Sequence, residues 1–415
     1  MKDRPALKII LWAALAAAPL AAQPQLKFVV IVTRHGVRAP TWDARQLNEY
    51  SAEPWPDFGV APGELTAHGR ALVQILGSYY RERFAKEHLL HAGCTDANKV
   101  YIWADTDQRT METGRALAES ILNGCRIQVH SRDGGKDPLF SGAATADPKL
   151  AAEAVRVRAG AEPEKLILDH RAALDALQRI LDGGQPTARK LLTSQGKNGN
   201  DKKGSALPDA LATASTLSEN LLLEYSNGMK DSQLGWGRLT KDRLYQVLEL
   251  HRVYADLTRR TQYLARVRGS NLLRHILASL QQAVSGMAEP GALGPPDTSL
   301  LVLSGHDTNL SNLSGMLGVS WTLAGYQPDE TPPGGAIIFS LWQDRKSSQL
   351  TVRTEYLAAS LDQMRSATPL TEKAPPLREA LSIPGCGNAS GCSWAEFDRL
   401  VRSQIDPSAV DFQVR

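Results

Sequence analysis

The chain has 415 residues, of which 42% are hydrophobic, and it carries 47 Lys and Arg against 44 Asp and Glu. This length and apolar content allow a large hydrophobic core and exclude a disordered chain. The formal net charge of +3 argues against a nucleic-acid-binding protein that relies on bulk positive charge, although local basic clusters remain possible. Any anion-binding site must therefore be built locally.

The first residues, "MKDRPALKIILWAALAAAPLAAQPQ", have the pattern of a secretory signal peptide. A charged start precedes an apolar run from Ile9 to Ala18 and small residues at Ala21 and Ala22, which predicts cleavage near Ala22. An uncleaved anchor is the alternative, but the run falls short of the ~20 residues that span a bilayer. We therefore predict a signal peptide over residues 1–22, a periplasmic or secreted mature protein, and no membrane contact after cleavage.

Strand-like and helix-like segments alternate up to about residue 140. The stretch Leu26–Val32 is apolar and β-branched, as in a buried strand, and "LTAHGRALVQILGSYYRERFAKEHLL" has helical spacing with Thr66 placed to cap it. A second strand at "KVYIWAD", a helix at "TDQRTMETGRALAESIL" and a third strand at "RIQVHS" follow. This part of the chain is typical of an α/β protein.

The pattern changes between Thr145 and Arg260, where Ala- and Leu-rich helical stretches predominate around one polar loop, "SQGKNGNDKKGSALPD". The α/β pattern then returns with a helix at "SNLLRHILASLQQAV", a strand at "SLLVLSG", a helix from Thr308, and strands at "GAIIFSLW" and "SQLTVRTEYL". We therefore predict an α/β domain from residues 23–144 and 261–415, with a helical insertion over 145–260.

The chain has four cysteines, Cys94, Cys125, Cys386 and Cys392, an even number that fits two disulfides in an exported protein. Pairing of nearest neighbours is the simplest connectivity, although the sequence permits three, and four free thiols are the alternative. A zinc site is disfavoured because no pair has the close CxxC spacing typical of such sites.

Three short segments, "TRHGVRAPT", "ADTDQRT" and "SGHDTN", each follow a predicted strand. Ligands of open α/β sheets bind at the carboxyl ends of the strands, so these segments are expected to share one edge. Together they supply Arg34, His35, Arg38, Thr41, Arg109, His306 and Asp307. The planar guanidinium of arginine matches phosphate oxygens bidentately, so three converging arginines predict a site for a phosphoryl group.

The histidine between two of these arginines is a candidate nucleophile. Neighbouring cations disfavour protonation of His35, and a neutral imidazole attacks phosphorus well. Asp307 is placed to protonate a leaving alkoxide, and His306 to bind phosphoryl oxygens. Each of these residues alone has an ordinary interpretation. The "HD" dipeptide also suggests a metal-dependent phosphohydrolase, but the surrounding sequence offers none of the further ligands that such sites use.

The segments "RHGVRAPT", "GHDTNLSNLSGMLGVSWTL" and "TPPGG" resemble the histidine acid phosphatase family, above all its bacterial periplasmic phytase and acid phosphatase members. The similarity extends to "LTAHG", "ADTDQRT", "DPLF", "GWGR" and the positions of Cys94 and Cys125. It implies a three-layer α/β/α, phosphoglycerate-mutase-like domain with an inserted helical domain, and no metal or other cofactor. We also expect a monomer that acts on a small-molecule phosphomonoester and binds no nucleic acid.

The resemblance assigns roles to the same residues. His35 would become phosphohistidine, Asp307 would be the proton donor, and the phosphate would be held by Arg34, Arg38, Thr41, Arg109 and His306. One departure concerns the substrate. The bacterial phytases carry a lysine directly after the motif threonine, where it reaches the substrate's other phosphates, and this chain has Trp42. Arg45, Lys230 and Arg238 are candidates to replace that charge.

Three other functions remain open. A phosphotransfer enzyme similar to phosphoglycerate mutase shares the short "RHG" motif, but export and the pairing of "RHGVRAPT" with "GHDTN" argue against it. A sugar-phosphate phosphatase similar to glucose-1-phosphatase would use the same chemistry on a smaller substrate. A binding protein that retains a phosphate pocket without turnover is disfavoured by the presence of both His35 and Asp307.

Overall fold

The computed structural model describes residues 23–160, 163–184, 207, 209–387 and 391–411. The predicted signal peptide and most of the predicted polar loop lie outside these residues. Within the described part of the chain, every helix is too short or too polar to span a membrane.

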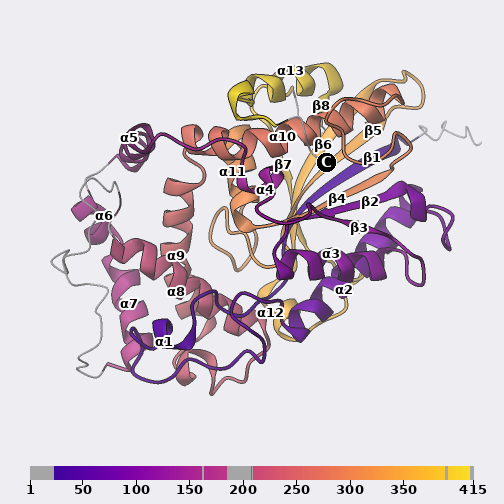
Figure 1. The fold of residues 1–415 in the computed structure, drawn as a ribbon. Coiled ribbons are helices and arrows are strands. Elements are labelled where there is room, and N and C mark those ends of the chain that lie inside the picture. The colour runs from indigo at the N-terminus through magenta and orange to yellow at the C-terminus, as the bar shows by residue number, and fades with distance from the viewer. Residues whose placement is uncertain (1–22, 161–162, 185–206, 208, 388–390, 412–415) are drawn as a thin grey trace, which may run out of the picture.

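A mixed sheet of eight strands lies at the centre of the described chain (Figure 1). The strands are β1 (Gln25–Arg34), β2 (Val100–Ala104), β3 (Val129–His130), β4 (Leu300–Gly305), β5 (Ala336–Gln343), β6 (Leu350–Ala358), β7 (Leu377–Leu381) and β8 (Cys392–Ser393). Their order is β3-β2-β4-β1-β5-β6-β7, with β8 also paired to β6. In this order the neighbours β3, β2, β4 and β1 are parallel to one another. The strand β5 is antiparallel to β1, β6 to β5, and β7 to β6. Because β4 lies between β2 and β1, the sheet is built from both ends of the chain, as predicted.

The helices are α1 (Ala44–Leu47), α2 (Ala67–Lys86), α3 (Gln108–Ile121), α4 (Pro138–Ser141), α5 (Pro148–Ala159), α6 (Pro163–Asp169), α7 (Arg171–Asp182), α8 (Asp209–Ser226), α9 (Lys241–Thr258), α10 (Gln262–Ser285), α11 (Asp307–Leu317), α12 (Leu361–Arg365) and α13 (Trp394–Gln404). The α2 helix starts where the sequence predicted, because the Thr66 side chain accepts a hydrogen bond from the Gly69 amide.

The sheet is covered on both faces. Successive residues of β1 point to opposite faces. Val29 and Ile31 join an apolar core with Tyr80 of α2, whereas Val30 and Val32 join a second core with residues of α10. Helices α2 and α3 therefore cover one face, and α10, α11 and α13 lie against the other (Figure 1). The predicted α/β/α fold is confirmed.

Helices α5 to α9 form a group beyond the carboxyl end of β1, with α9 packed on both α7 and α8 (Figure 1). This group occupies the region of the predicted helical insertion, and its bounds as a separate domain at 145 and 260 remain a prediction. Its position matters because α8 and α9 face the edge of the sheet where the candidate residues lie.

Two disulfides are present, Cys94–Cys125 and Cys386–Cys392, with S–S distances of 2.03 and 2.04 Å. The nearest-neighbour pairing is therefore confirmed. The first disulfide joins the segment before β2 to the segment after α3, so it closes the unit that carries Arg109.

Candidate active site

The three sequence segments meet at one edge of the sheet. In the parallel register Arg34 of β1 lies opposite Gly305 of β4, and Ala104 of β2 lies opposite Ser304. The backbone amide of His35 donates to the Gly305 carbonyl oxygen at 2.9 Å, which fixes the loop after β1 against the loop after β4. The predicted convergence of "TRHGVRAPT", "ADTDQRT" and "SGHDTN" is what the register of the strands produces.

The imidazole of His35 is buried and held in one orientation. Its Nδ1 lies 2.8 Å from the Gly36 carbonyl oxygen. A carbonyl can only accept, so we assign the ring proton to Nδ1, which leaves a lone pair on Nε2. Burial, and then the charges of Arg34, His306, Arg38 and Arg109, hold the pKa of His35 well below its usual value. The ring is therefore a neutral imidazole with a free nitrogen.

The glycine after this histidine has a packing reason. A Cβ on Gly36 would lie 2.7 Å from Val73 Cγ2 and 3.0 Å from the Gly69 carbonyl oxygen, both on α2. The Gly36 amide donates to Thr113 Oγ1 of α3 at 3.0 Å. The loop that carries His35 therefore packs directly against α2 and α3, the two helices of one outer layer.

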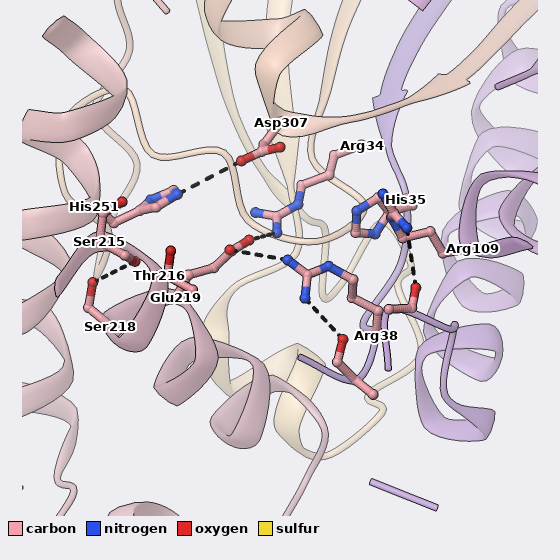
Figure 2. Close-up of polar contacts among 12 residues, drawn as sticks. Arg34, His35, Arg38, Arg109, Ser215, Thr216, Ser218, Glu219, His251 and Asp307 are labelled. Atoms are coloured by element: carbon pink, nitrogen blue, oxygen red, sulfur yellow. Dashed lines mark hydrogen bonds and ion pairs between the residues drawn. The ribbon is translucent and has the colours of Figure 1, made fainter. Parts of the chain in front are cut away.

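Two of the predicted arginines share one carboxylate (Figure 2). Arg34 donates to Glu219 Oε1 and to the Thr331 carbonyl oxygen at 2.6 Å, and Arg38 donates to Glu219 Oε2 at 3.1 Å. Burial raises the pKa of Glu219, but the charges of Arg38 and Arg34 outweigh it and lower that pKa to about 2. The two guanidiniums are therefore held in place by an ionised carboxylate from α8.

The third predicted arginine lies on the other side of His35. Arg109 donates to Asp107 Oδ2 at 2.6 Å, and its Nη1 lies 3.6 Å from the position that a Cβ on Gly63 would take. The Cγ2 of Thr41 lies at the same distance from that position, so Thr41 borders Arg109 at the surface of the site.

His306 is oriented by an acidic side chain. Its Nε2 lies 2.8 Å from Asp105 Oδ2, and its ring centroid is 5.5 Å from that of His35 at an interplanar angle of 74°. The backbone amide of His306 donates to Asn309 Oδ1 at 2.8 Å, which fixes the start of α11. Because carboxylates only accept, Nε2 carries a proton on this side of the ring.

Asp307, the first residue of α11, is partly buried among cations. Its Oδ2 accepts a hydrogen bond from Arg259 and lies 3.8 Å from His251 Nε2 (Figure 2). Burial raises the pKa of Asp307, but Arg259, Arg34 and His251 together hold it well below its usual value. Asp307 is therefore a carboxylate in the structure without substrate.

All seven predicted site residues lie at this edge of the sheet, but the sequence motifs did not reveal five side chains that surround them. These are Asp105, Glu219, His251, Arg259 and Glu330. The available signal was weak: Glu219 lies inside "LSENLLLEYS", where a charged residue in an apolar helix could have been noticed. Asp105 lies inside "ADTDQRT", a segment already assigned to the site, but its contact with His306 was not predicted. The other three lie in segments with no distinctive pattern.

Two groups of side chains in the described chain have the composition of a metal site. They are Asp105, Asp107 and His306, and Glu219, His251 and Asp307, in each of which the ligand atoms lie within 4.8 Å of one another. Each carboxylate in these groups already has a cationic or imidazole partner within the site. The arginines thus supply the positive charge that a metal would supply elsewhere.

Comparisons with known proteins give one consistent result. The profile of the histidine phosphatase superfamily, branch 2, matches residues 25–356. Phytase AppA from Escherichia coli (strain K12) is 35% identical over 93% of this chain and 94% of its own length, and a glucose-1-phosphatase from Salmonella typhimurium is 26% identical over 91% and 92%.

Solved structures agree. A Hafnia alvei phytase in complex with tartrate superposes with a TM-score of 0.83 at 34% identity, covering 95% of this chain and all of its own. The phytase from Citrobacter braakii gives a TM-score of 0.83 at 32% identity over 94% of this chain and all of its own. The resemblance seen in the sequence motifs is thereby confirmed, and the chain belongs to the histidine phosphatase superfamily, branch 2, a superfamily that includes acid phosphatases and phytases.

Proposed function

We propose that this protein is an exported acid phosphomonoesterase that works through a phosphohistidine at His35. The observation that carries the proposal is the free Nε2 of a buried, neutral imidazole beside three guanidiniums. In this proposal Arg34, Arg38, Arg109, Thr41 and His306 bind the phosphoryl group, and Asp307 is the proton donor. The two disulfides support an oxidising compartment, periplasmic or secreted.

The chemistry follows in two steps. The lone pair of His35 Nε2 forms a bond to phosphorus while the ester P–O bond breaks, and Asp307 gives its proton to the leaving oxygen. The water oxygen then forms a bond to phosphorus while the bond between phosphorus and His35 Nε2 breaks, and Asp307 takes a proton from that water. The arginines stabilise the charge on the phosphoryl oxygens in both transition states.

The low pKa of Asp307 is compatible with this role. Its carboxylate is ionised because cations surround it, and a bound phosphate brings compensating negative charge to those same cations. Substrate binding therefore raises the pKa of Asp307 toward the range in which it can hold a proton at acid pH.

We further propose that phytate is accepted as a substrate. Support comes from the phytases to which the chain is similar and from a fourth guanidinium, Arg259, beside Asp307. Arg45 and Lys230 are exposed and available to a polyanion, whereas Arg238 is held by Glu53 at 2.7 Å and by a backbone carbonyl.

A sugar monophosphate is the second candidate. The chain is also similar to glucose-1-phosphatases, and Trp42 places an aromatic ring next to Thr41. That ring is half-buried, with its centroid 5.8 Å from the ring of Tyr50. An apolar surface at this position suits a small sugar better than it suits a polyanion.

The central experiment is His35→Ala. Nitrophenyl phosphate turnover should fall by at least about 10⁴-fold, because the attacking atom is removed while the arginines remain. Wild-type enzyme quenched in acid should carry acid-labile phosphate on His35, and the variant should carry none. His91→Ala, an exposed histidine paired with Asp96, is the control and should retain full activity. A variant that keeps its activity, or a wild type that forms no phosphoenzyme, would contradict the mechanism.

A further inference from the structure

A second buried histidine lies behind Asp307, on the side away from His35 (Figure 2). His251 comes from α9, is 2% exposed, and its Nδ1 lies 3.0 Å from Glu330 Oε1. Glu330, also 2% exposed, comes from the segment between α11 and β5. Since a carboxylate only accepts, Nδ1–H donates to Glu330, and the ring is fixed with Nε2 directed at Asp307.

The other nitrogen of this ring has no hydrogen-bond partner within the described residues. It lies 3.8 Å from Asp307 Oδ2, just beyond hydrogen-bond distance. Arg259 donates to the same oxygen. Two cationic groups therefore face Oδ2. The guanidinium keeps its protons at every pH of interest, whereas the imidazole can release one.

The charges around His251 are unequal. Glu330, Asp307 and Glu219 face it with negative charge. The cations Arg34 and Arg259 donate to Glu219 and Asp307, respectively. Burial alone would lower the pKa of His251, but the carboxylates, with Glu330 first, raise it to about 9. The ring is thus an imidazolium in acid and neutral solution, with its Nε2–H next to the proposed proton donor.

We propose that the Glu330–His251 pair stores the proton that Asp307 uses in catalysis. The proposal rests on the proposed function, since it needs Asp307 as the acid. When a bound phosphate raises the pKa of Asp307, the Nε2–H bond of His251 breaks and an O–H bond forms at Oδ2. The neutral ring keeps Nδ1–H on Glu330, and its Nε2 lone pair then accepts from the protonated carboxyl.

The proton that leaves His251 in the first step returns to it in the second. The proton on Oδ2 passes to the leaving oxygen as the ester P–O bond breaks and the bond to His35 Nε2 forms. In the second step the bond between phosphorus and His35 Nε2 breaks as water attacks, and Asp307 takes a proton from that water and returns it to His251 Nε2. His251 contacts neither phosphate nor leaving group in this scheme, so it is a positioning residue that acts through Asp307.

The test is His251→Gln, because the glutamine amide keeps a donor toward Asp307 but has no proton to release. Wild type is first shown to form a phosphoenzyme, which settles the proposed function separately. The kcat for an alkyl phosphate such as glycerol phosphate should then fall about 10- to 100-fold at neutral pH. It should recover toward acid pH, where solvent protonates Asp307 directly. The kcat for nitrophenyl phosphate should change less than about threefold, because that leaving group scarcely needs a proton.

A matched control exists at His170, the residue that precedes α7. His170 forms a similar pair with Glu249 of α9 at 2.5 Å, with no contact to Asp307, and His170→Gln should leave both pH profiles unchanged. Equal losses on both substrates at all pH values in His251→Gln would show a purely structural role and overturn the proposal. An unchanged alkyl-phosphate profile would also overturn it, since Asp307 would then take its proton from solvent.

A second variant keeps the proposal testable if His251→Gln does not fold. Glu330→Gln retains an acceptor for Nδ1–H and removes the charge that stabilises the imidazolium. The alkaline limb of kcat for alkyl phosphate should move to lower pH, while the nitrophenyl phosphate profile stays in place. A folded Glu330→Gln enzyme with an unmoved alkaline limb would contradict the proton store.

Discussion

The strand-end segments and the helices α8 and α9 contribute to the site in different ways. The segments after β1, β2 and β4 supply the candidate nucleophile, the candidate phosphate-binding arginines and the candidate acid, all within a few residues of a strand. The helices supply Glu219 and His251, which contact those groups from behind. Arg34 and its partner Glu219, for example, are 185 residues apart in the sequence. The sequence motifs therefore mark the side chains that are expected to contact the substrate. The helices supply the charged partners that hold those side chains and determine their protonation.

This difference predicts two kinds of mutational effect. A change at a strand end should remove activity with limited effect on folding, because these side chains face the site. A change on α8 should lower stability first, because it leaves a buried guanidinium without its counter-charge. The predictions below separate the two regions.

After the loss of His35 itself, the largest effect is expected at Asp307. Asp307→Asn should lower kcat for alkyl phosphates by about 10²- to 10⁴-fold and affect nitrophenyl phosphate far less, because only the alkoxide needs a proton. Steady-state kinetics on both substrates measures the difference. The control is Asp256→Asn on α9, which removes an ion pair of 2.6 Å with Arg158 of α5. It should leave both rates unchanged. Equal losses on the two substrates would show that Asp307 only positions the substrate.

Glu219→Gln tests the helical side of the comparison. The substitution removes the carboxylate that the buried Arg34 and Arg38 share, and removing one partner of a buried ion pair typically costs about 3–5 kcal/mol of unfolding free energy. Denaturant unfolding at neutral pH measures it. Inorganic phosphate should stabilise the variant more than wild type, because the anion replaces the missing charge. A loss of activity with full stability would place Glu219 with the strand-end residues instead.

The same variant has a pH signature. The pKa of Glu219 is depressed to about 2 in the folded protein, so its contribution to stability is complete above its ordinary value and is lost as pH falls toward 2. The stability difference between wild type and Glu219→Gln should therefore shrink as the pH of the unfolding experiment is lowered below about 4.5. A difference that stays constant over this range would show that the carboxylate charge is not the source of the effect.

The comparison also explains what the sequence could predict. Strands β1, β2, β4, β5 and β6 and the Thr66 cap follow from local periodicity and capping, and the strand ends then bring seven residues together. Strand β7 was missed because it is a five-residue strand at the sheet edge, in which the adjacent charged residues Arg378 and Glu379 break the alternation of apolar and polar side chains. Glu219 and His251 were missed for another reason: whether a charged residue on a helix is solvated or buried against an arginine depends on packing that no local pattern records.

The smallest effect is expected at Trp42, the position that bears on substrate choice. Trp42→Lys adds a cation next to Thr41, where the ring now packs near Tyr50. An exposed charge pair contributes up to about 1 kcal/mol, so kcat/KM for phytate should rise by up to about fivefold, with little change for a sugar monophosphate. The gain should shrink at high salt, since screening weakens an exposed charge. Trp42→Gln removes the ring without adding charge, and a gain in that variant too would mean that the ring obstructs the entrance. An unchanged ratio of the two kcat/KM values in both variants would mean that this position does not set specificity, and the choice between phytate and a sugar phosphate would then depend on Arg259 and the other cations of the helical side.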